Sequence, residues 1–344
     1  MRKFILSLLL LAFCLEMNAQ FQVRRIWDTG YSAFPSIEKF NGKYYITFRE
    51  GEGHVFDKNG IAAGKIRVLC SEDGEEWKSV ALLAKDGFDL RDPKLSVTPD
   101  GRLMLTIGGS VYEGKELKQR IPHVAFSNDG YDFSNPVPAV FSSDIPFGME
   151  WLWRLTWNGD TGYSVIYGEK FALVKTTDGL HYDTITELDV DGVPNETTVR
   201  FTKDGRMAMM IRRENDGKGR YGWWGVSEAP YTDWSFIPMG LGLGGPDFTI
   251  LEGEGDLGTD SPLVIAGTRS YLIARSPKTI LLKGNLDGLF EEVCVLPSGG
   301  DCSYTGFLVE GDELWTVYYS SHELKRAAIY FTRIPLGFFG SDGN

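Results

Sequence analysis

The sequence predicts an all-β fold, a six-bladed β-propeller whose blades are sheets of four short strands. A hydrophobic strand, a Gly-containing turn and a second strand recur along the chain, with turns at Gly42, Gly101, Gly159, Gly205, Gly255 and Gly311. The intervals between these glycines are 59, 58, 46, 50 and 56 residues, a length that fits four short strands per repeat. The composition agrees, because 41 Gly, 21 Phe, 15 Tyr and 9 Trp favour strands and tight turns.

A second pattern recurs inside the repeats. Ser or Thr is followed by any residue, Asp, Gly, two further residues and an aromatic residue, at 71–77, 127–133 and 176–182. The Asp carboxylate can accept turn N–H groups, Gly can adopt a positive φ, and the aromatic ring can hold the hairpin against the sheet. Weaker versions occur at 227–234 and 285–290. We therefore expect the same turn in successive blades.

The two ends of the chain predict how the ring closes. Residues 302–335 supply about three strands, and residues 21–27 form a strand with no neighbour in sequence. Pairing the N-terminal strand into the last blade would remove both open sheet edges. We therefore expect one propeller domain over residues 20–344, in preference to a sandwich or two stacked domains.

The first nineteen residues predict a signal peptide. Arg2 and Lys3 precede an apolar run over 4–13, and Ala19 offers a small residue before a cleavage point. The run is too short to cross a bilayer, which needs about 20 apolar residues. A lipoprotein anchor at Cys14 is disfavoured by the bulky Phe13 before it. We expect a secreted or periplasmic protein.

Composition limits the partners. With 35 Lys and Arg against 47 Asp and Glu, the formal charge is −12, which disfavours nucleic acid and anionic membrane surfaces. The four His residues and the Cys residues show no metal-ligand spacing, so we expect no metal and no cofactor. After cleavage three Cys remain, of which Cys294 and Cys302 could pair. We expect a monomer whose partner is a glycan.

Polar and aromatic residues gather where the first strand of each blade begins and the second ends. These positions share one rim of a propeller, because neighbouring strands of a hairpin are antiparallel. The rim candidates are Arg49, Arg91, Asp92, Arg154, Glu196, Arg213, Asp247, Arg269 and Tyr304. Arginines bind carboxylates, aromatic rings stack on sugars, and a carboxylic acid can protonate a leaving oxygen. This mixture suits an anionic sugar.

Three segments make the chain similar to one family. Residues 195–213 place Glu196 before a hairpin and an arginine pair, residues 303–308 contain Tyr304, and residues 267–269 end in Arg269. Together with the repeated Asp-Gly turns, which resemble Asp boxes, these segments resemble the sialidase (neuraminidase) superfamily of six-bladed propeller glycoside hydrolases.

The resemblance implies a retaining mechanism. Tyr304 would be the nucleophile, Glu196 its base, and Asp57, in the loop 51–64, the acid/base. Glu50, Glu52 and His54 compete for that last role. Arg213 and Arg269 would bind the substrate carboxylate.

One departure from the family pattern affects the substrate. Sialidases open the first blade with an arginine, an apolar residue and proline, whereas this chain has Ala33-Phe34-Pro35. Arg49, Arg91 or Arg154 would have to compensate. Loss of one bidentate contact would cost about 2–3 kcal/mol, roughly a hundredfold in affinity.

Two other interpretations stay open. Asp92, Glu196 and Asp247 could act as channel carboxylates on a different, uncharged glycan. The propeller could also bind glycans without cleaving them.

Overall fold

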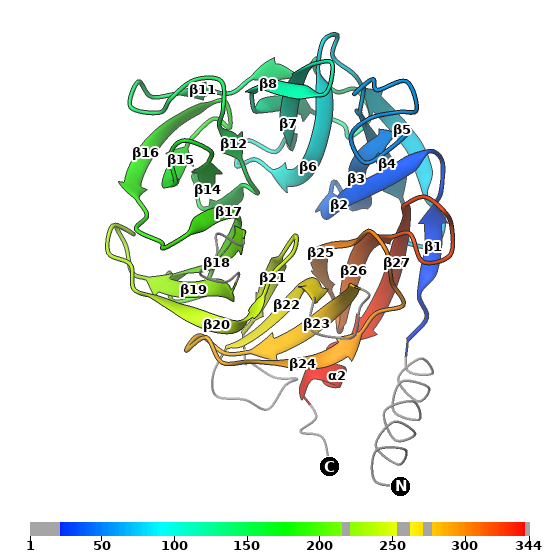
Figure 1. Ribbon diagram of the computed structural model, residues 1–344. Helices are drawn as coiled ribbons and strands as arrows, with labels where there is room; N and C mark the ends of the chain where they lie inside the picture. The colour runs from blue at the N-terminus through cyan, green and yellow to red at the C-terminus, as the bar shows by residue number, and fades with distance from the viewer. Residues whose placement is uncertain (1–20, 215–220, 253–261, 271–276, 341–344) are drawn as a thin grey trace, which may run out of the picture.

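The strands form six sheets arranged as blades around a central axis (Figure 1). The computed structural model describes residues 21–214, 221–252, 262–270 and 277–340. Within those ranges the only helix is the short α2 (Gly337–Gly340), and no helix is long and apolar enough to cross a membrane. The prediction of an all-β, six-bladed propeller is confirmed.

The main strands of each blade run outward in chain order from the innermost one, except that the outermost strand of the third and of the sixth blade comes from an earlier part of the chain. The first contains β2 (Tyr31–Phe40), β3 (Lys43–Gly51), β4 (Lys65–Ser71) and β5 (Lys78–Leu83). The second contains β6 (Asp89–Val97), β7 (Leu103–Glu113), β8 (Glu116–Arg120), β9 (His123–Ser127) and β10 (Val137–Pro138). The third contains β12 (Trp151–Leu152), β13 (Thr156–Asn158), β14 (Thr161–Tyr167), β15 (Ala172–Thr176), β16 (His181–Glu187) and β11 (Val140–Phe141).

The remaining three blades each have four strands. The fourth contains β17 (Val193–Phe201), β18 (Met207–Glu214), β19 (Tyr221–Ser227) and β20 (Phe236–Gly242). The fifth contains β21 (Asp247–Leu251), β22 (Leu263–Ser270), β23 (Lys278–Gly284) and β24 (Phe290–Val295). The sixth contains β25 (Cys302–Glu310), β26 (Glu313–Ser320), β27 (Ala328–Pro335) and β1 (Arg24–Trp27).

The ring closes between the two ends of the chain. β1 pairs antiparallel with β27, with Arg24 opposite Phe331 and Arg25 opposite Tyr330, and Figure 1 shows the two strands side by side. The first and sixth blades also meet through Lys39, whose Nζ lies 2.6 Å from Glu310 Oε1. The expected closure by the N-terminal strand is confirmed, and it leaves no unpaired edge on β27.

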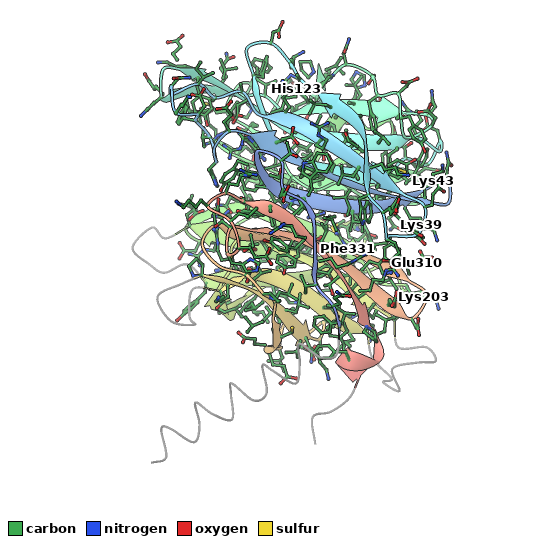
Figure 2. The ribbon with its side chains drawn as sticks, turned by 90° about the vertical axis from the view of Figure 1, so that its right-hand side faces the viewer. Lys39, Lys43, His123, Lys203, Glu310 and Phe331 are labelled. Atoms are coloured by element: carbon green, nitrogen blue, oxygen red, sulfur yellow. The ribbon has the colours of Figure 1, made fainter. Side chains whose placement is uncertain are left out.

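The hairpins between first and second strands lie on one face of the disc. Figure 2 shows Lys39, Lys43, Lys203 and Glu310, all at or next to these hairpins, along one edge of the molecule. The beginnings of the inner strands therefore lie at the opposite face. That arrangement brings the predicted rim positions to a common end of the central channel.

The repeated Asp-Gly turns connect the two outer strands of the first three blades. In each turn the Gly N–H donates to the side-chain oxygen of the first residue at 2.9 Å, and the Asp carboxylate accepts the N–H two residues later at 2.8 Å. The glycines Gly74, Gly130 and Gly179 have φ between 76° and 83°. Each packs on the preceding blade, against Trp315, Tyr45 and Met104 respectively. The turn therefore joins neighbouring blades as well as strands.

Two local features were not predicted. β7 runs past the rim to Glu113 and returns as β8, and the inner strand of the third blade is split into β12 and β13. The split occurs where Trp153 and Arg154 leave the sheet.

Some predictions concern cysteines or residues without a described position. Cys70, Cys294 and Cys302 are buried and form no disulfide. The disulfide between Cys294 and Cys302 that the sequence allows is therefore absent from the described residues. The signal peptide at 1–19 and the turn glycine Gly255 lie outside the described residues.

Gly130→Ala should destabilise the protein by about 2–5 kcal/mol. An L-residue at φ 83° costs about 1–2 kcal/mol, and a Cβ at this site would collide with the Tyr45 ring, which adds about 1–3 kcal/mol. Gly101→Ala is the matched control, because Gly101 has φ 80° with open space around it. Equal losses for both variants in urea unfolding would contradict the blade contact.

Candidate active site at the axial cavity

Four inner strands break their regular pairing at the same level. The register shifts near Phe34 in β2, Asp92 in β6, Glu196 in β17 and Tyr304 in β25. Three of these residues have a positive φ, at 64° for Phe34, 49° for Asp92 and 53° for Tyr304. Bulges of this kind redirect side chains, and a positive φ in a residue other than Gly costs about 1–3 kcal/mol. All four side chains border one cavity.

The cavity has a volume of about 400 Å³ and lies where the inner strands begin. Its walls combine aromatic rings with charged groups from five of the six blades and from the loop 51–64. The principal lining residues are Phe34, His54, Arg91, Asp92, Tyr112, Arg120, Trp151, Tyr167, Asn195, Glu196, Glu214 and Tyr304.

Tyr304 and Glu196 form a direct hydrogen bond at the cavity. Tyr304 Oη donates to Glu196 Oε1 at 2.5 Å, although the two residues are 108 positions apart. Arg212 Nη1 lies 2.6 Å from the same Oε1 and 3.4 Å from Tyr304 Oη. Tyr304 and Glu196 are each 7% exposed. A hydroxyl beside a carboxylate is the arrangement of a nucleophile with its base.

The surroundings of Tyr304 determine whether its hydroxyl is protonated. Burial raises the pKa of Tyr304 well above its usual value, and the Glu196 carboxylate raises it further. Tyr304 is therefore a neutral phenol near pH 7. It can become a nucleophile only in a step in which Glu196 takes its proton.

Asp92 and Arg91 lie beside this pair. Burial raises the pKa of Asp92 above its usual range, and Arg91 and Lys94 oppose that shift. Arg91 Nε is 3.5 Å from the Asp92 carboxylate, and the Arg91 guanidinium is 5.4 Å from the Phe34 ring centroid. Among the described residues none hydrogen-bonds Asp92 Oδ1. This oxygen can meet a substrate group.

The chain is similar to known proteins in its fold but not in its sequence. No protein-family model matches the chain, and no curated relative matches it. A protein of unknown function from Dyadobacter fermentans has a TM-score of 0.69 at 17% identity over 90% of this chain and 98% of its own. Trypanosoma rangeli sialidase has a TM-score of 0.68 at 14% identity, over 90% of this chain and 56% of the sialidase.

A further similar structure is an α-L-arabinofuranosidase from Fusarium graminearum, determined with an iminosugar inhibitor. Its TM-score is 0.68 at 14% identity, over 92% of this chain and 99% of that chain. The fold is shared with glycoside hydrolases. At these identities the likeness to the sialidase and the arabinofuranosidase extends to the fold alone.

The structure brings Arg212, not the predicted Arg213, to Glu196. Pro194 pairs with Arg213 and Thr197 with Ile211, so Arg212 lies opposite the bulge that contains Glu196. Neighbouring residues of a strand point to opposite faces, and the buried Arg213 lies over the Trp223 ring at 5.4 Å. The sequence offers both arginines, and only the bulge decides which one faces the cavity.

Arg49 and Asp57 lie outside the set of residues that line the axial cavity. Arg49 is buried, binds Asp89 at 2.7 Å and donates to the backbone oxygens of Gly53 and Val55. Asp57 accepts N–H groups of its own loop, and the hydrogen bond from Ile61 contributes most to a lowered pKa. Arg49 therefore anchors the loop, and Asp57 caps a turn within it.

Arg154 and Asp247 lie deeper in the channel. Asp247 is fully buried between Arg154 Nη2 at 3.2 Å and Arg200 Nη2 at 2.7 Å. Nearby, burial and then Arg154 lower the pKa of Lys94 to about 7. Of the three predicted channel carboxylates, Asp92 and Glu196 thus reach the cavity, whereas Asp247 is held by two arginines below it.

Arg269 belongs to a separate cluster at the rim. Its Nη1 lies 3.4 Å from Asp301 Oδ1, and Asp301 Oδ2 lies 2.6 Å from His54 Nδ1. Sequence reasoning missed Asp301 and the cavity residues Tyr112 and Arg120, which belong to the extended β7–β8 hairpin. No repeat pattern marks that hairpin, because it occurs in one blade.

Asp89→Asn should lower the free energy of unfolding by about 3–5 kcal/mol. The Arg49 and Asp89 side chains are 1% and 0% exposed, and the variant would leave a buried guanidinium without a counter-charge. Asp100→Asn, which removes an exposed partner of Arg102, should cost less than about 1 kcal/mol. Similar urea midpoints for the two variants would show that the Arg49 pair does not support the fold.

Proposed function

We propose that the protein is a retaining glycoside hydrolase in which Tyr304 is the nucleophile and Glu196 its base. The observation that carries the proposal is the 2.5 Å hydrogen bond between these residues at the axial cavity. The fold shared with glycoside hydrolases supports the same class of reaction. We further propose that the protein is secreted or periplasmic, in keeping with its predicted signal peptide, and that it acts as a monomer.

In the first step Tyr304 Oη bonds to the anomeric carbon while the bond to the leaving oxygen breaks. Glu196 takes the phenolic proton, and a separate acid gives a proton to the departing oxygen. In the second step the deprotonated acid takes a proton from water as the water oxygen bonds to the anomeric carbon, the tyrosyl bond breaks, and Glu196 returns the proton to Tyr304. Arg212, 2.6 Å from Glu196, offsets negative charge that moves between the two oxygens.

A terminal anionic sugar such as sialic acid is the leading substrate. A neutral phenol avoids the repulsion that a carboxylate nucleophile would meet beside the carboxylate of the sugar, and sialidases use a tyrosine nucleophile. Arg91 and Arg120 border the cavity and can face an anion. The resemblance of the sequence to sialidases points the same way.

An uncharged glycan is the second candidate. Ala33 stands in the first blade where sialidases place an arginine, and the ring of the next residue, Phe34, packs 4.9 Å from the Tyr304 ring. Arg212 is already bound to the carboxylates of Glu196 and Glu214. These features reduce the charge that is free to bind a substrate carboxylate, and Asp92 and Glu196 would then serve a neutral sugar.

Tyr304→Phe and Glu196→Gln should each lower kcat by about 10³-fold or more, because they remove the nucleophile and its base. Initial rates on the best substrate, with Tm as a check of folding, provide the measurement. Tyr318→Phe is the matched control, since it removes a buried hydroxyl that binds Pro297 outside the cavity. A kcat for Tyr304→Phe within threefold of the wild type would rule out the tyrosine mechanism.

A panel of glycosides separates the candidate substrates. Release of sialic acid from α-sialosides is expected for the leading substrate, and cleavage of α-L-arabinofuranosides or other neutral glycosides alone would favour the second. Binding of panel glycans without release of any sugar would contradict hydrolysis and leave a glycan-binding propeller.

A further inference from the structure

The proposed mechanism needs a group that protonates the leaving oxygen and later activates water. Asp57, expected in this role, does not reach the cavity, and a lowered pKa makes it a poor proton donor near neutral pH. Besides Glu196, the carboxyl and imidazole groups that border the cavity are Asp92, Glu214 and His54. Glu214 is already ion-paired with Arg212, which leaves Asp92 and His54 as candidates. The inference below rests on the proposed function.

His54 is held from two sides. Its Nδ1 lies 2.6 Å from Asp301 Oδ2, and its backbone oxygen accepts a hydrogen bond from Arg91 Nη2 at 3.3 Å. The imidazole packs edge-on against Phe34 at 5.3 Å, and Phe34 lies 4.9 Å from the Tyr304 ring. Phe34 therefore contacts both the imidazole and the Tyr304 ring.

Asp301 carries a negative charge beside His54. Burial alone would raise the pKa of Asp301, but hydrogen bonds from His54, Tyr31 and Tyr319 lower it to about 2. The Tyr319 hydroxyl donates to Oδ1 at 2.8 Å, and the Tyr31 hydroxyl donates to Oδ2. A carboxylate in this position accepts the Nδ1 proton of His54, as in other His–Asp pairs that fix a tautomer. Among the described residues none hydrogen-bonds Nε2, which can then exchange a proton with substrate.

Exposure distinguishes His54 from Asp92. The side chain of Asp92 is 10% exposed, close to the 9% of Glu196, whereas that of His54 is 50% exposed. The leaving group must depart toward solvent, and water must arrive from the same side. An acid/base at the open mouth of the cavity meets both needs.

We propose that His54 is the catalytic acid/base and that Asp301 is its positioning residue. In the first step the imidazolium gives its Nε2 proton to the glycosidic oxygen as that C–O bond breaks and the bond to Tyr304 forms. In the second step neutral Nε2 takes a proton from water while the water oxygen bonds to the anomeric carbon and Tyr304 leaves. The imidazolium is regenerated, so the cycle balances.

The test compares two leaving groups on one sugar. The 4-nitrophenyl and methyl α-glycosides of N-acetylneuraminic acid are the first pair, with the corresponding α-L-arabinofuranosides as the second. His54→Asn should lower turnover of the methyl glycoside by about 10²–10⁴-fold, because that leaving group needs a proton. Formation of the glycosyl-enzyme from the 4-nitrophenyl glycoside should change less than tenfold, and azide should restore turnover as a glycosyl azide.

Two variants serve as controls. His181 forms a similar pair, with Nδ1 2.7 Å from Asp178 Oδ2, in an outer turn away from the cavity, so His181→Asn should leave both rates unchanged. Asp92→Asn should lower the turnover of both glycosides by a similar factor. If Asp92→Asn shows the leaving-group dependence and azide rescue while His54→Asn does not, the assignment of His54 is wrong.

Asp301→Asn tests the positioning role. Its kcat should fall more for the methyl glycoside than for the 4-nitrophenyl glycoside, with KM little changed, because the imidazole loses the acceptor that orients it. Tyr31, Arg91, Asp92 and Arg269 also face this cluster and remain in the variant. Equal losses for the two glycosides, or no loss for either, would overturn the positioning role.

The outcomes separate this inference from the proposed function. Equal losses on both leaving groups in His54→Asn, with Tyr304→Phe still inactive, overturn only the acid/base assignment. Full activity of Tyr304→Phe, or no cleavage of any glycoside by the wild type, overturns both.

Discussion

The bulges at the start of the inner strands are the constraint on which the site depends. Phe34, Asp92 and Tyr304 adopt positive φ angles, and the bulge in β17 turns Glu196 toward the same point. Each strained residue costs about 1–3 kcal/mol, which the surrounding structure must offset. The closed ring does so, because every inner strand is paired within its blade and packed between two others. Closure of the ring therefore stabilises the strained residues that border the cavity.

Buried charge below the cavity gives the site its electrostatic character. Asp247 is neutralised by Arg154 and Arg200, and Lys94 has a lowered pKa. These groups lie in a region of low dielectric, where charges interact more strongly than in water. The Tyr304–Glu196 pair lies above these buried charges, at the cavity, and Arg212 is its ion-pair partner. The proposed proton transfer between Tyr304 and Glu196 would take place in this pre-organised environment.

Phe34 contacts both the Tyr304 side and the His54 side of the cavity. Its ring contacts Tyr304, Tyr319 and His54, and the Arg91 guanidinium lies over it. Ala33, which precedes Phe34, stands where sialidases place the first-blade arginine, so this chain lacks that charge beside these rings.

The sequence by itself determined the number of blades and their closure, because the spacing of the turns and the alternation within strands are local properties. Repeat position alone also placed Tyr304, Glu196 and Asp92 at one rim; their roles remain predictions. Tertiary structure alone decided that Arg212 rather than Arg213 faces Glu196, since one bulge shifts the alternation by one residue. It also decided that His54 rather than Asp57 borders the cavity, because long-range contacts between Arg49 and Asp89 and between His54 and Asp301 hold the loop. Such contacts leave no periodic signal in the chain.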